Sequence, residues 1–130
     1  MTHPDVSLNE LILAFLTHAK THCRRADGTA TNEQMEFRQA FKPLKKLHGE
    51  SLAAEFGPAK LKAVREAMVE AGICRTLVNR RVLRVRFLFR WAVEQEMVLT
   101  TVYHSLKTVI GLQFGRTPAP ETDPITPVEA

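Results

Sequence analysis

The chain has 130 residues, of which 45% are hydrophobic and 25% are charged, and its formal net charge is +4. This composition is typical of a folded globular protein rather than a disordered or fibrous one, and the length suits one domain. No apolar run approaches the roughly 20 residues of a membrane-spanning helix, and residues 1–9 lack the basic and then apolar order of a secretion signal. We therefore expect a cytoplasmic protein whose cysteines stay reduced.

The positive charge is concentrated in two segments. Residues 20–48 carry seven Lys and Arg against three acids, and residues 74–96 carry six Arg against two Glu. The three remaining parts of the chain each have a small negative charge. Two separate cationic segments are what a surface for a polyanion needs, although a run of charge can equally be a solvated helix face.

The first two predicted helices come before residue 50. Ser7-x-x-Glu10 is a capping box, and the helix after it is expected to run to about His22 with Leu8, Leu11, Ile12, Phe15, Leu16 and Ala19 facing inward. Asp27-Gly28 marks a loop. A second helix is expected from about Thr31, in a weaker capping box with Gln34, to a C-cap at Gly49, with the apolar face Phe37, Ala40, Phe41, Leu44 and Leu47. Pro43 is expected to kink this helix or to divide it.

Three further helices are expected after residue 50. Gly57-Pro58 opens one that ends at Gly72. The next begins at Arg75 or Thr76 and ends at about Glu96, with the inner face Val78, Val82, Val85, Phe89, Ala92 and Val93. A short fifth helix spans Thr101 to about Thr108. We thus expect an all-α, compact bundle of four main helices plus a short fifth over residues 1–111, and an extended Pro-rich tail over residues 112–130.

Residues 78–93 carry a resemblance to a known family. The sequence from Val78 to Val93 is similar to the long fourth helix of the N-terminal core-binding domain of tyrosine recombinases, the phage-integrase family, with its pattern N-x-x-x-x-x-I/V-x-x-x-F-x-W-A. Residues 94–98 resemble the exit from that helix, and Leu11-Ile12 with Phe15-Leu16 fits the first helix. The resemblance covers roughly residues 7–115 and implies a SAM-like helical domain that grips duplex DNA at a recombination core site.

The resemblance also implies that the second and fourth helices contact the DNA. Together with the charge pattern it predicts these contacts: Thr29, Thr31, Gln34, Arg38, Lys42 and Lys45 from the second helix, and Arg75, Thr76, Asn79, Arg80 and Arg84 from the fourth. Arginine offers a bidentate fork to phosphate or guanine, and a helix N-terminus attracts phosphate. Asn79 could either read adenine in the major groove or cap a turn.

The remaining candidates predict no catalysis within these residues. Tyr103, the only tyrosine, precedes the expected linker and is interpreted as a packing or interface residue, because the family's nucleophile belongs to a catalytic domain that this sequence lacks. His18 and His22 with Cys23 are interpreted as a polar helix end rather than a metal site. Trp91 and Phe87 are expected to pack in the core rather than to stack on bases. We expect no cofactor, metal, membrane or small-molecule substrate. The expected partners are double-stranded DNA and, weakly, other copies on that DNA.

Two other functions remain open from the sequence. The chain could be a different helical DNA-binding regulator, which would bind as a stable dimer. It could also be a helical protein–protein adaptor whose basic faces meet an acidic partner or remain solvated. The dependence of DNA affinity on salt separates the adaptor from a DNA-binding domain.

Overall fold

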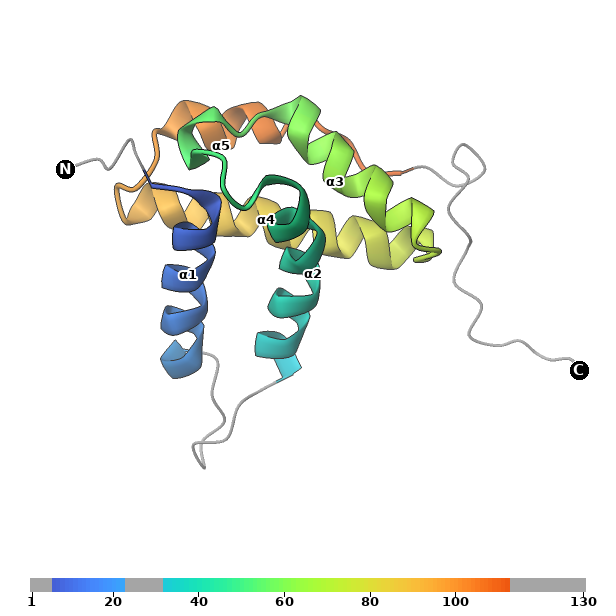
Figure 1. The fold of residues 1–130 in the computed structure, drawn as a ribbon, viewed down its shortest axis with the longest axis horizontal. Coiled ribbons are helices and arrows are strands. Elements are labelled where there is room, and N and C mark those ends of the chain that lie inside the picture. The colour runs from blue at the N-terminus through green and yellow to red at the C-terminus, as the bar shows by residue number, and fades with distance from the viewer. Residues whose placement is uncertain (1–5, 23–31, 113–130) are drawn as a thin grey trace, which may run out of the picture.

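The computed structural model describes residues 6–22 and 32–112, and within them it confirms an all-α bundle (Figure 1). The elements in chain order are α1 (Leu8–His22), α2 (Asn32–His48), a 3₁₀ turn η1 (Ala53–Glu55), α3 (Pro58–Glu70), α4 (Arg75–Glu94) and α5 (Thr100–Leu106). None of the helices in these two ranges is long and apolar enough to cross a membrane. The tail expected over residues 112–130 lies outside the description apart from Leu112.

The predicted capping box begins α1. The backbone N–H of Ser7 donates to Glu10 Oε1 at 2.9 Å, and the N–H of Glu10 donates to Ser7 Oγ at 3.1 Å. The next two N–H groups, of Leu8 and Asn9, donate to the carbonyls of Ser51 and Gly49 at 2.9 and 2.8 Å. The start of α1 is therefore docked on the turn that follows α2, which satisfies N–H groups that have no partner within the helix.

The longest helix, α4, lies at the centre and packs against each of the other four (Figure 1). α1 and α2 lie side by side, run in opposite directions and cross α4 on one side. α3 and α5 cover the other side of α4. This order places both predicted cationic helices, α2 and α4, in direct contact.

Aromatic rings fill the junction of α1, α2 and α4. Phe15, only 2% exposed, makes edge-to-face contacts with Phe37 and Phe41 of α2 at centroid distances of 4.8 and 5.7 Å. It makes the same kind of contact with Phe87 and Trp91 of α4 at 6.1 and 5.3 Å. Such pairs stabilise a fold by about 0.5–1.5 kcal/mol each beyond the area that they bury. Phe15 therefore holds three helices together.

Gly49 is needed at the α1–α2 junction for close packing. Its φ is not positive, but a Cβ added there would lie 2.6 Å from the carbonyl oxygen of Lys45 and 2.5 Å from Asn9 Oδ1. Gly72, at the end of α3, is the glycine with a left-handed φ, of 85°. Glycine is thus favoured at these two predicted helix ends for different reasons: close packing at Gly49 and a left-handed backbone at Gly72.

The structure departs from the sequence predictions at two places in and after α2, and it narrows a third. Pro43 lies inside a helix that continues to His48, so of the two predicted outcomes, a kink or a division of α2, division is excluded. Leu47, expected in the core, lies in the last turn of α2 and is 44% exposed. The turn η1 was not predicted, since three residues are too few to show a period.

Candidate nucleic-acid interface

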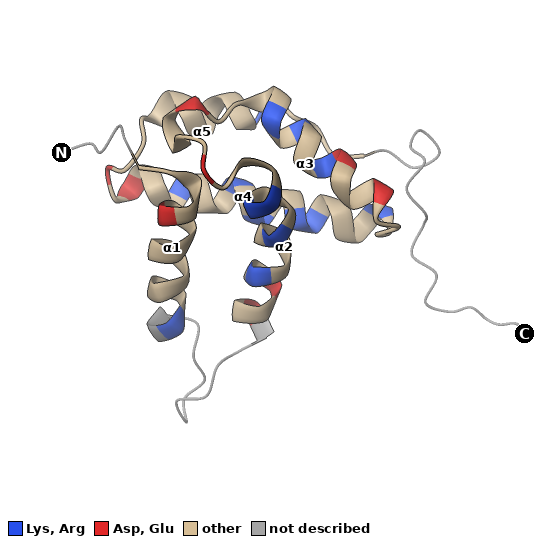
Figure 2. Ribbon diagram, in the orientation of Figure 1, with Lys and Arg blue, Asp and Glu red and all other residues tan. Residues whose placement is uncertain are grey.

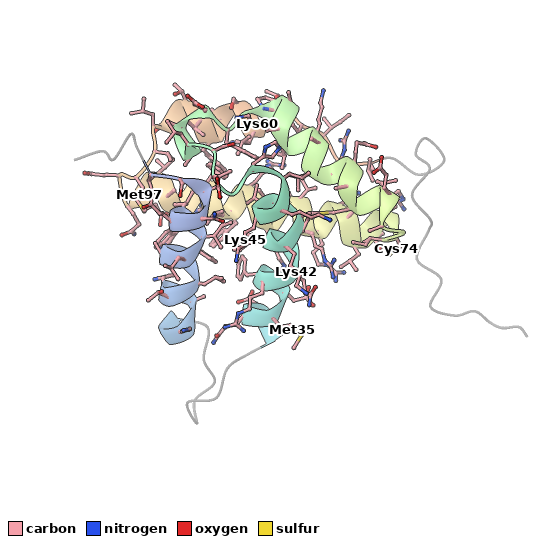
Figure 3. All side chains as sticks on the ribbon, in the orientation of Figure 1. Met35, Lys42, Lys45, Lys60, Cys74 and Met97 are labelled. Carbon is pink, nitrogen blue, oxygen red and sulfur yellow. The ribbon has the colours of Figure 1, made fainter. Side chains whose placement is uncertain are left out.

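The outer face of α2 carries the predicted cations. Arg38, Lys42 and Lys45 are exposed, and Met35 on the same stripe is 60% exposed. Figure 3 shows Met35, Lys42 and Lys45 along this helix. The stripe is a consequence of periodicity, because Phe37, Phe41 and the other core residues occupy the opposite side. Thr29 and Thr31 lie outside the described residues.

Gln34 belongs to the core side of α2. It is 5% exposed and lies three residues before Phe37 and seven before Phe41, which is the spacing of the buried stripe. A side chain covered in this way cannot touch a double helix unless α2 moves. Gln34 is therefore removed from the candidate interface, although the sequence placed it among the DNA contacts.

The first two turns of α4 carry the second set of predicted contacts. Thr76 and Arg80 are exposed, and Arg75 is half-buried. Cys74, the residue that precedes α4, forms no side-chain cap. The partial positive charge of the helix N-terminus therefore adds to the charges of Arg75 and Arg80 on this part of the surface.

Arg84 connects the basic part of α4 to α2. Its guanidinium carbon lies 4.9 Å from the centroid of the Phe37 ring, and the side chain is half-buried. A cation held over an aromatic face contributes about 0.5–2 kcal/mol. Because Phe37 belongs to the buried stripe of α2, this contact joins Arg84 to the core-facing side of α2 rather than to the stripe that carries Arg38.

Asn79 has a structural role in the fold. Its Nδ2 donates to the carbonyl of Leu112 at 3.0 Å, and the N–H of Leu112 donates to Asn79 Oδ1 at 2.7 Å. A Cβ on Gly111 would lie 3.2 Å from the same amide group. Arg65 of α3 holds the preceding residue, since its Nη1 donates to the carbonyl of Ile110 at 2.9 Å. Of the two roles left open for Asn79, the geometry favours the structural one. The side chain, however, binds the backbone of Leu112, after α5, and does not cap a local turn.

Lysine and arginine positions follow both contacting helices. Figure 2 shows them along α2 and at several points of α4, which α2 crosses. The described cations of the predicted interface are Arg38, Lys42, Lys45, Arg75, Arg80 and Arg84. None of the six is fully buried, and the helices that carry them touch.

An aromatic groove, which the sequence reading missed, lies between α1, α2 and α4. Its volume is about 550 Å³. Leu83 and Phe87 are 55% and 43% exposed beside it, so the expectation that Phe87 packs in the core is met only in part. Trp91 is half-buried and packs on Phe15 and His18, at 5.3 and 5.4 Å. The signal in the sequence that could have indicated this groove is the apolar surface of α4, which is wider than one buried helix face.

A smaller polar hollow lies where α2 ends and α1 begins. It is lined by Asn9 and residues 45–51 and measures about 460 Å³. His48 lies there, with its ring 5.9 Å from that of Phe56. Burial, followed by the charge of Lys60, lowers the pKa of His48 from its ordinary value, while a backbone hydrogen bond at Lys60 acts in the opposite direction. His48 is thus held toward its neutral form.

The remaining sequence candidates lie apart from these surfaces. Tyr103 is half-buried against the core edge, and Lys107 Nζ lies 5.6 Å from its ring centroid. Within residues 6–22 and 32–112, no three His, Cys, Asp or Glu side chains form a group that could hold a metal. The side chain of His22 and the whole of Cys23 lie outside the description.

No protein-family model, curated protein or solved structure matches this chain.

Proposed function

We propose that this domain binds duplex DNA through the exposed cations of α2 and the first half of α4, as the core-binding domain of a tyrosine-type site-specific recombinase or integrase. The observation that carries the proposal is the direct packing of α2 against α4, with their cations left at the surface. Cleavage and strand exchange would belong to a separate catalytic domain, so these residues bind and position DNA without catalysis.

Phosphate contacts would provide most of the affinity. A lysine or arginine that neutralises a phosphate releases condensed counterions, and the log–log slope of affinity against salt is about −0.9 for each contact. If all six described cations contact phosphate, the slope is about −5. A salt dependence of this size distinguishes a polyphosphate surface from an ordinary solvated helix face.

A few exposed side chains would add modest base selectivity. Thr76 and Arg80 lie at the exposed start of α4, where a helix inserted into the major groove presents its first residues to base edges. Arg80 could bond guanine in a bidentate manner, and Thr76 could accept or donate. Asn79 between them is engaged by Leu112, so adenine reading is not assigned to it.

A charge-reversal pair tests the surface. We expect Lys42→Glu to weaken binding of a fluorescein-labelled duplex at least about tenfold at low salt, because it replaces an attraction to phosphate with a repulsion. The matched control is Lys107→Glu, at the C-cap of α5, which changes the net charge equally but lies outside the proposed surface. Fluorescence anisotropy at several salt concentrations gives both the affinity and the slope.

The outcomes separate the three functions. Equal losses for the two variants would mean that net charge alone attracts the duplex. No measurable duplex binding at about 50 mM salt would favour the adaptor. A stable dimer without DNA, seen by analytical ultracentrifugation, would favour a different helical regulator.

A further inference from the structure

The aromatic groove between α1, α2 and α4 has the dimensions of a ligand site. Its volume of about 550 Å³ lies within the roughly 300–1,000 Å³ that is usual for small-molecule pockets. The residues around it come from three helices whose packing is fixed by Phe15. Neither the charge pattern nor the resemblance assigns this groove a role.

The wall of the groove is aromatic. The ring centroids of Phe15, Phe37 and Phe87 lie 4.8 to 6.1 Å apart. The ring of Trp91 packs against Phe15 at 5.3 Å. Leu83 and Phe87 leave about half of their surface uncovered at the groove. Single exposed apolar residues are ordinary, but two beside an aromatic cavity form a continuous apolar surface. Another planar ring can pack on such a wall by stacking or by edge contact.

Two arginines lie on the α4 side of the groove. Arg80 and Arg84 are one helical turn apart and both line the cavity. The guanidinium of Arg84 is held over the Phe37 ring, and a stacked guanidinium keeps the donors around its edge for an oxyanion. Arg80 is exposed and, like Arg84, lines the groove.

The two glutamates that line the groove do not fully neutralise the charge of Arg80 and Arg84 at its α4 end. Glu94 lies more than two turns farther along α4 than Arg84. Even with Glu33 of α2 counted at the same end of the groove, Arg80 and Arg84 leave a formal charge of +1 there. The cavity therefore combines an aromatic wall with a cationic end.

We propose that this groove binds a planar aromatic anion, with its rings against Phe87 and Trp91 and its anionic group against Arg80 and Arg84. This site is additional to the DNA surface, and its binding can be measured without DNA. Because Arg80 and Arg84 are also proposed DNA contacts, such a ligand would compete with the duplex, a consequence that rests on the proposed function.

Two fluorescent dyes with one aromatic framework test the proposal. The anionic dye is 1-anilinonaphthalene-8-sulfonate, and the neutral dye is N-phenyl-1-naphthylamine, which lacks the sulfonate. We expect the anionic dye to bind the whole chain saturably at one site. We also expect energy transfer from Trp91, the only tryptophan, to report that the dye is bound, while the variants show where it is bound.

Three variants assign the contacts. Phe87→Ala should weaken both dyes about tenfold, because it removes part of the aromatic wall. Arg80→Gln should weaken the anionic dye about threefold to tenfold and leave the neutral dye within about twofold, because only the charged hydrogen bond is lost. Leu13→Ala is the control, since Leu13 is 67% exposed on α1 and does not line the groove.

Several results would overturn the proposal. One is dye binding that does not saturate or that Leu13→Ala reduces as much as Phe87→Ala does. Another is an Arg80→Gln variant that weakens neither dye or weakens both equally. Circular dichroism checks that each variant is folded, and Leu83→Ala, at a 55% exposed position of the same wall, replaces Phe87→Ala if that variant unfolds.

Discussion

The side chain of Asn79 gives both of its polar atoms to the backbone of Leu112, 33 residues farther along the chain. Sequence reasoning could not find this partner, because nothing in the local pattern of α4 indicates where the chain returns. An asparagine among arginines at a helix start fits base reading and the capping of a turn equally well. Only the position of residues 110–112 against α4 distinguishes these roles.

We predict that Asn79→Ala lowers the free energy of unfolding by about 1–3 kcal/mol, because two hydrogen bonds are lost and a backbone N–H is left without its acceptor. Urea denaturation measures this change, and amide exchange at Leu112 should become faster. Duplex affinity should change by less than about threefold. A much larger loss of affinity in a folded variant would show that Asn79 reads a base after all.

His48 makes stability depend on pH. Burial and the charge of Lys60 lower its pKa below the ordinary value of 6.5. Between the lowered and the ordinary pKa the unfolded chain binds more protons than the folded one, so the free energy of unfolding falls as the pH drops through and below 6.5.

We therefore predict that the midpoint of thermal unfolding falls between about pH 7 and pH 5.5, and that His48→Gln reduces this slope. Circular dichroism melts of both proteins at matched pH values give the comparison. Other histidines and carboxyl groups contribute equally to both curves, so the difference reports His48. Parallel curves would contradict the assignment.

The helices α1 and α2 show which features of a helix its sequence predicts and which it does not. The capping box of Ser7 with Glu10 was found from four residues, because both hydrogen bonds are local. The exposed stripe of Arg38, Lys42 and Lys45 followed from helical periodicity. Gln34 and Leu47 were misplaced, since the sequence does not show which turns of α2 are covered by neighbouring helices.

The junction of α1 and α2 yields a prediction at this scale. We expect Gly49→Ala to lower the free energy of unfolding by about 1–3 kcal/mol, because the new Cβ would lie too close to the Lys45 carbonyl. Gly57→Ala is the comparison variant, since a Cβ at Gly57 meets nothing within 4 Å and a loss there reflects only the preference of an N-cap for glycine over alanine. Chemical denaturation of the two variants should separate them by more than about 1 kcal/mol, and similar values would contradict the close approach.

For the whole molecule, the contacts of Phe15 link three helices. Phe15→Ala should lower the free energy of unfolding by about 3–5 kcal/mol, enough to unfold a marginally stable domain. Leu13→Ala on the same helix, at a position that is 67% exposed, should change it by less than about 0.5 kcal/mol. Urea denaturation measures both, and a mild effect of Phe15→Ala would mean that α1 contributes little to the core.

The sequence by itself determined the helix order, the capping of α1, most of the buried stripe and the presence of two cationic segments, because periodicity and local hydrogen bonds depend on near neighbours. Tertiary structure alone decided that α2 lies against α4, that Gln34 is covered, that Asn79 holds Leu112 and that an aromatic groove remains open. These features depend on how residues far apart in the chain come together, and contact between distant segments is set by packing rather than by local pattern.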